Sequence, residues 1–131
     1  MVNLMRKIRA LEAWVREHPA LADVPVATVA GRPVSPREIL GMLRRGEGVE
    51  EALAALAKAG LDPDEEEEWR LLEEYLRRLL EQPGPKPVIM VLGQAITLQQ
   101  ALVHVRARDA KGKALLQMYR RLRAYMATRV G

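Results

Sequence analysis

The feature that most constrains this chain is a pair of helix-start signals. Residues 35–38 read Ser-Pro-Arg-Glu, and residues 97–100 read Thr-Leu-Gln-Gln. In each, the first hydroxyl can accept a hydrogen bond from the backbone N–H three residues later, and the side chain there can reach back to the first N–H. Pro36 takes the first helical position, where a missing N–H costs nothing. Apolar residues at helical spacing follow both signals, so each predicts a helix with a defined start.

Further helices are predicted on both sides of these two. Asn3 is expected to cap a first helix that Pro19 ends. Residues 49–59 predict a short helix, and residues 62–82 predict a long acidic one. Asp109 is expected to cap a last helix, so that the basic C-terminal helices occupy residues 97–130. The fold class is therefore all-α, with five or six helices in a single domain covering residues 1–131.

The acidic helix has its own charge pattern. Glu precedes Arg by four residues three times, which is the favourable order for an ion pair: Glu66 and Arg70, Glu73 and Arg77, Glu74 and Arg78. The four acids at 65–68 suit a helix N-terminus through the macrodipole. A divalent-metal site is the alternative for this run. Because consecutive helical residues fan out, we do not expect them to converge on one ion.

Extended connectors separate the helices. Residues 20–34 are rich in Pro and Val and predict a short strand or ordered loop, with a tight turn at 31–33. Residues 83–87 form a stiff Pro-rich connector, and residues 88–92 are either a short strand or the start of an apolar helix. Residues 29–44 also resemble residues 91–106. This likeness is either common to any loop that enters a capped helix, or the sign of a pseudo-twofold arrangement whose extended pieces pair as a small two-stranded ribbon.

Charge is strongly segregated along the chain. Residues 1–45 carry eight Lys and Arg against four acids, residues 46–82 four against twelve, and residues 83–131 nine against one. This asymmetry predicts two cationic ends that meet a polyanion, and an acidic middle that faces water or another basic surface. We expect Lys113, Arg120 and Arg121 to face the polyanion and residues 65–68 to face away from it.

The predicted contacts to double-stranded DNA are phosphate contacts, independent of sequence. On the last helix, small residues lie between cations and would let a phosphate backbone come close. A solvated surface is the alternative for both cationic ends. The nucleic-acid-binding residues that we predict are Arg6, Lys7, Arg9, Arg106, Arg108, Lys113, Arg120, Arg121 and Arg123.

Catalytic chemistry finds little support in the sequence. The chain has no Cys, no phosphate-binding glycine loop and no zinc-protease or serine-hydrolase motif. His18 and His104 have no carboxylate or second His at ligand spacing. We therefore predict no enzyme, no catalytic residue, no metal and no cofactor. A helix-turn-helix over residues 35–59 has the right proportions, but Glu50 and Glu51 would repel DNA phosphates.

Hydropathy predicts a protein that does not span a membrane. The longest apolar run, residues 88–92, is far shorter than the roughly 20 residues that a spanning helix needs. The start lacks the apolar core of a secretory signal, so we expect cytoplasmic synthesis. Asn3 is the only Asn, whereas Glu, Arg and Pro are abundant, a composition typical of heat-adapted proteins.

The cationic helix over residues 113–129 and the cluster of Arg6, Lys7 and Arg9 carry a resemblance. A small, helical, cysteine-free chain with such basic ends resembles the α-helical major capsid proteins of filamentous viruses that infect hyperthermophilic archaea. The resemblance implies a homo- or hetero-dimer that wraps double-stranded DNA in a helical nucleocapsid, and so a place in the virion. The alternative is a small cellular protein-interaction module or transcriptional regulator from a hyperthermophile.

Overall fold

The computed structural model of the chain describes the backbone of residues 2–58 and 65–130, and the side chains of residues 4–57 and 65–125. Its elements, in chain order, are α1 (Val2–Glu17), β1 (Ala27–Val29), β2 (Arg32–Val34), α2 (Pro36–Arg45), α3 (Val49–Lys58), α4 (Glu65–Glu81), β3 (Ile89–Val91), β4 (Gln94–Ile96), α5 (Leu98–Ala107) and α6 (Ala110–Val130). The predicted predominance of helices is confirmed, with six in the described part of the chain.

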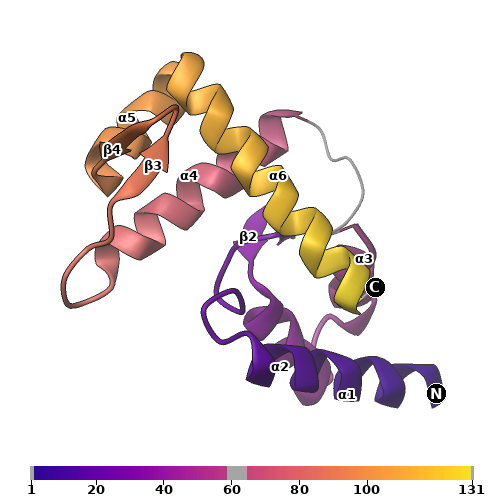
Figure 1. The fold of residues 1–131 in the computed structure, drawn as a ribbon. Helices are drawn as coiled ribbons and strands as arrows, with labels where there is room; N and C mark the ends of the chain where they lie inside the picture. The colour runs from indigo at the N-terminus through magenta and orange to yellow at the C-terminus, as the bar shows by residue number, and fades with distance from the viewer. Residues whose placement is uncertain (1, 59–64, 131) are drawn as a thin grey trace. The chain divides into compact units, whose positions relative to one another are not determined.

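The order helix, β-hairpin, helix, helix occurs twice along the chain (Figure 1). The chain forms two compact units that follow this repetition. We call Met1–Asp62 together with Arg123–Gly131 the N unit, and Pro63–Leu122 the C unit. The likeness between residues 29–44 and 91–106 therefore marks a hairpin followed by a capped helix in each unit.

Each hairpin closes through a two-residue turn of the kind that right-handed strand twist favours. Ala27 pairs with Val34 and Ile89 with Ile96, both in antiparallel register. The turn residues have left-handed backbones: φ is 52° and 78° at Ala30 and Gly31, and 50° and 79° at Leu92 and Gly93.

The hairpins correct two expectations and decide between two alternatives that the sequence left open. The first turn lies at Ala30 and Gly31, one residue before the predicted one. Residues 88–92 contribute a strand and not a helix. The two extended pieces do not pair with each other, because each pairs with the segment that directly follows it, so the described chain contains two small ribbons.

The predicted helix starts at Ser35 and Thr97 are confirmed as complete capping boxes. The Ser35 hydroxyl accepts from the Glu38 N–H at 3.3 Å, and the Glu38 carboxylate accepts from the Ser35 N–H at 3.0 Å. The corresponding distances at Thr97 are 3.1 and 2.9 Å. Asp109 caps α6 as expected, since its Oδ1 accepts from the Gly112 N–H at 2.9 Å. The backbone of α1 begins at Val2, and the side chain of Asn3, the predicted cap, lies outside the described ones.

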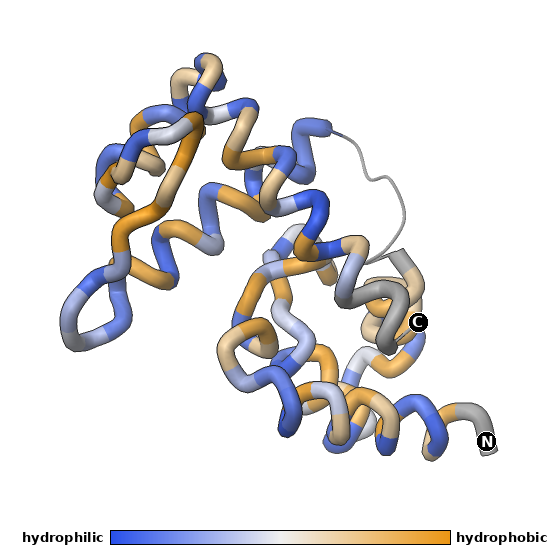
Figure 2. Tube along the Cα trace, viewed as in Figure 1, coloured by the Kyte–Doolittle hydropathy of each residue, from blue (hydrophilic) through white to orange (hydrophobic). Residues whose placement is uncertain are grey.

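Apolar residues recur along the helices of both units (Figure 2), and many of them are buried. In the N unit α1 packs on α2, and α3 packs on both α2 and β1. Its buried residues include Leu11, Val15, Val26, Ile39 and Leu43. In the C unit α4 packs on α5. Its buried residues include Leu72, Leu76, Leu98, Leu102, Val105, Leu115 and Tyr119.

Helix α6 approaches α5 closely at Gly112. A Cβ atom at this position would lie 2.2 Å from the carbonyl oxygen of His104, which is far inside contact distance. Only a residue without a side chain allows the two backbones to come so near. The glycine that interrupts the apolar pattern of the last helix is therefore a packing requirement of the C unit.

One interhelical ion pair occurs at the same place in both units. Arg44 on α2 binds Glu12 on α1 at 3.2 Å, and Arg106 on α5 binds Glu73 on α4 at 2.8 Å. Arg44 and Arg106 each lie nine residues after the N-cap of their helix. These pairs fix which residues of the two units are equivalent.

Candidate nucleic-acid interface

Three of the predicted DNA-binding arginines are bound to the acidic helix of their own unit. Arg106 Nε donates to Glu73 at 2.8 Å. Arg108 donates to both carboxylate oxygens of Glu66, at 2.6 and 2.7 Å. Arg120 does the same with Glu68, at 2.8 and 2.7 Å. Arginines of the basic C-terminal segment thus bind glutamates of α4 within the C unit.

Two of these pairs, those of Arg108 and Arg120, are bidentate. A guanidinium fork matches the two oxygens of a carboxylate, which gives stronger and more directional bonds than a single contact. Of the ion pairs predicted within α4, that between Glu74 and Arg78 is observed, at 3.0 Å. Glu73 binds Arg106 of α5 instead, and Glu66 binds Arg108, the C-cap residue that follows α5. Spacing along one helix therefore did not determine their partners.

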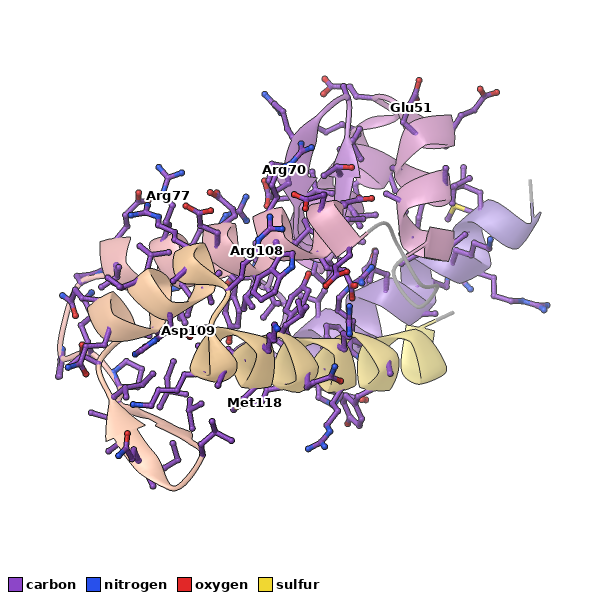
Figure 3. All side chains as sticks on the ribbon, turned by 90° about the horizontal axis from the view of Figure 1, so that it is seen from above. Glu51, Arg70, Arg77, Arg108, Asp109 and Met118 are labelled. Carbon is purple, nitrogen blue, oxygen red and sulfur yellow. The ribbon has the colours of Figure 1, made fainter. Side chains whose placement is uncertain are left out.

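The pair of Arg108 and Glu66 shows the electrostatic effect of this contact. The hydrogen bond from Arg108 and its charge lower the pKa of the Glu66 carboxyl, against a smaller opposing effect of burial. Arg108 also lies over the ring of Trp69, 5.1 Å from its centroid, in a cation–π arrangement. Figure 3 shows Arg108 beside α4, whereas Met118 lies on the side of α6 away from α4.

The pairing corrects the expected division of surfaces. Arg120 was expected to face a polyanion and Glu68 to face away, yet they bind one another, and the Glu68 side chain is only 4% exposed. Residues 63–122 carry ten Lys and Arg against nine acids, so the opposite charges of the two segments nearly cancel within the C unit. The acidic middle faces a basic surface, and that surface belongs to the same chain.

Arg123, another predicted DNA-binding residue, is buried and does not lie at an exposed surface. It is 4% exposed and belongs to the N unit. A side chain that is folded into the protein in this way is not positioned to reach a phosphate backbone.

Seven predicted residues are exposed, and two of them, Arg106 and Arg108, bind carboxylates of α4. The other five are Arg6, Lys7 and Arg9 on α1, and Lys113 and Arg121 on α6. Within the described part of the chain, none of the five has an ion pair with a carboxylate. They are the cations of the predicted site that the fold leaves available to an external anion.

Both histidines make definite contacts. His104 Nδ1 lies 2.6 Å from Asp109 Oδ2, so the expectation that His104 lacks a nearby carboxylate is wrong. The bond from His104, followed by that from the Gly112 N–H, lowers the pKa of Asp109. His18 stacks on Trp14 at 4.8 Å between ring centroids, and its Nε2 lies 3.1 Å from the Tyr125 hydroxyl. Among the described residues, no three His, Asp or Glu side chains converge as metal ligands would.

Three arginines outside the predicted DNA-binding set line one groove of the N unit: Arg16 on α1, and Arg37 and Arg44 on α2. The signal that marks this groove in the sequence is Gly41. A glycine in the middle of an amphipathic helix weakens that helix, so it calls for a structural reason.

Comparison of the chain with known protein families, curated proteins and solved structures found no match. Of the helices in the part of the chain that the structure describes, none has both the length and the apolar character of a bilayer-crossing helix.

Proposed function

We propose that the protein is a structural nucleic-acid-binding protein that coats double-stranded DNA through phosphate contacts. The observation that carries this proposal is the set of five exposed cations on α1 and α6 that no described carboxylate neutralises. Lysine and arginine side chains of this kind release counterions from the DNA backbone, which gives binding that is independent of sequence.

Phosphate contact is favoured over base reading by the burial of both tryptophans and by the acidic first turn of α3. Trp14 and Trp69 are 4% and 5% exposed, so neither is available as a stacking platform for a base. Helix α3, which a helix-turn-helix would place in the major groove, exposes Glu50 and Glu51 in its first turn. Those carboxylates would repel the phosphates on either side of the groove.

The finer form of the proposal is a nucleocapsid protein of a filamentous archaeal virus, working as a dimer within a larger assembly. The hairpin of β3 and β4 supports an assembly, because Val88, Met90 and Leu92 are each more than 60% exposed. Adjacent apolar side chains at the surface are typical of protein contacts. The same hairpin favours the second candidate, a cellular protein-interaction module that binds no DNA.

Measuring binding to unrelated duplex oligonucleotides at increasing salt tests the proposal. Affinity should fall steeply with salt and vary little with sequence. Lys113→Gln and Arg121→Gln should each flatten the slope of log K against log salt by about 0.9, the value for one phosphate contact on B-form DNA.

Arg106→Gln and Arg108→Gln serve as matched controls. They also remove one cation each, but from side chains already bound to Glu73 and Glu66, so they should leave the slope unchanged. Binding that does not respond to salt would refute phosphate contact. Absence of DNA binding, together with a change in self-association for Met90→Ser, would favour the interaction module.

A further inference from the structure

The groove between α1 and α2 lies wholly within the N unit and has a volume of about 440 Å³. Arg16, Arg37 and Arg44 line it, with Glu12 as the one acidic lining residue. Gly41 lines it as well and contributes no side chain. The groove is therefore both open and predominantly cationic.

The existing ion pairs hold two of these arginines without using up their donors. Arg37 donates to Asp23 through Nε at 2.9 Å, and the Arg44 guanidinium binds Glu12 at 3.2 Å. A guanidinium carries five N–H groups, so several donors on each side chain remain. Arg16 is exposed and has no ion pair with a carboxylate in the described residues. The pairs of Arg37 with Asp23 and of Arg44 with Glu12 are partly exposed, and ion pairs of this kind are weak. Both arginines can therefore bind a stronger anion as well.

The residues at the equivalent positions of the C unit differ from those that line the groove. Counted from the N-caps, the equivalent of Arg37 is Gln99, and the equivalent of Gly41 is Val103. Val103 is 63% exposed on α5. The C unit thus has an amide in place of the guanidinium, and a branched side chain where the N unit leaves space.

A third difference concerns the cation on the first helix of each unit. Counted from the equivalent residues Glu12 and Glu73, Arg16 corresponds to Arg77. Arg77 lies 3.7 Å from Glu74, three residues before it. The N unit has Ala13 in place of Glu74. All three differences make the N-unit groove more open or more positive.

Packing does not require a glycine at position 41. A Cβ atom there would meet only the far end of the Arg45 side chain, at 3.0 Å, and that flexible group can move. Glycine inside a helix weakens the helix. The glycine therefore keeps the groove open at a cost in helix stability.

We propose that the groove seats one phosphate group between the guanidinium groups of Arg16 and Arg37, with Arg44 beside them. Guanidinium forks bind phosphate oxygens in pairs, which makes arginine suited to this ligand. Resting on the proposed function, the phosphate is one of the nucleic-acid backbone. Arg9, two helical turns before Arg16 on the same face of α1, would meet a neighbouring phosphate.

The test uses the full chain with two probes: inorganic phosphate and a duplex oligonucleotide. Each is followed by the NMR signals of the Gly41 amide and of the Arg16 and Arg37 Nε–H groups. Both probes should shift these signals. Gly41→Val and Arg37→Gln introduce the residues that the C unit has at the equivalent positions, Val103 and Gln99. In Gly41→Val the Nε–H signals of Arg16 and Arg37 should no longer shift, and in Arg37→Gln the Gly41 amide and the Arg16 Nε–H signal should no longer shift. Arg37→Gln should also flatten the salt slope of duplex binding by about 0.9.

Two controls isolate the groove. Val103→Gly opens the equivalent place in the C unit and should leave binding unchanged. Arg32→Gln removes an exposed cation of the N unit that lies outside the groove. Circular dichroism of Gly41→Val and Arg37→Gln verifies that both are folded.

Signals that neither probe moves would overturn the groove proposal, and so would equal loss of duplex affinity in Arg37→Gln and Arg32→Gln. DNA binding with an unresponsive groove would refute the groove and leave the proposed function standing. Shifts with inorganic phosphate but not with duplex would support the phosphate seat and refute nucleic acid as the source of the phosphate.

Discussion

Replacing Gly112 by Ala should destabilise the protein, although alanine is the better helix former. The added Cβ atom would lie 2.2 Å from the His104 carbonyl oxygen, so α6 and α5 would have to separate by about 1 Å to restore contact distance. Overpacking of this kind costs about 1–3 kcal/mol. The gain in helix propensity is at most about 1 kcal/mol, and less in the first turn. We expect a net loss of about 1–2 kcal/mol.

Urea denaturation followed by circular dichroism measures this loss. Gly41→Ala is the matched control, because its Cβ atom would meet only the mobile end of Arg45, at 3.0 Å. That substitution should stabilise by about 0.5–1 kcal/mol through helix propensity. If Gly112→Ala proved as stable as Gly41→Ala, the close approach of α5 and α6 would not be a constraint.

Three further predictions concern caps, a turn and acid stability. Ser35→Ala and Thr97→Ala should each lower the free energy of unfolding by about 1 kcal/mol, and unchanged thermal melts would contradict their capping role. Leu92→Asn should raise that free energy by about 1 kcal/mol, because asparagine tolerates the left-handed turn position; a loss in urea denaturation would count against the turn. The hydrogen bond from His104 lowers the pKa of Asp109 in the folded state. The ionised Asp109 therefore stabilises the fold above the ordinary carboxyl pKa of 3.8, and this stabilisation is lost as the pH falls below 3.8. Asp109→Asn should remove this part of the acid sensitivity, and an unaltered pH profile would show that the contact does not contribute.

Local structure was predictable because its causes lie within a few residues of sequence. The capping boxes at Ser35 and Thr97 involve a hydroxyl and a side chain only three residues apart. Asp109 was identifiable as a cap for the same reason. The first turn was misplaced by one residue, since Ala30 takes a left-handed backbone that the sequence alone assigns to Gly31.

The candidate site was less predictable, because its charges find partners across helices. Glu66 was expected to bind Arg70 on its own helix but binds Arg108, 42 residues away. Arg120 and Glu68 are 52 residues apart. Net charge along a segment says how much charge is present, but helix packing decides how much of it stays available at the surface.

The interhelical pairs of the C unit have a consequence for the order in which the chain comes apart on heating. Charged groups become easier to desolvate as temperature rises, so ion-pair networks lose less of their strength than other interactions. In the C unit Glu66, Glu68 and Glu73 tie α4 to α5 and α6. In the N unit, the pair of Glu12 and Arg44 joins α1 to α2. Because these pairs join all three helices of the C unit, we expect the amide protons of α4, α5 and α6 up to Leu122 to be among the last to exchange near the melting temperature.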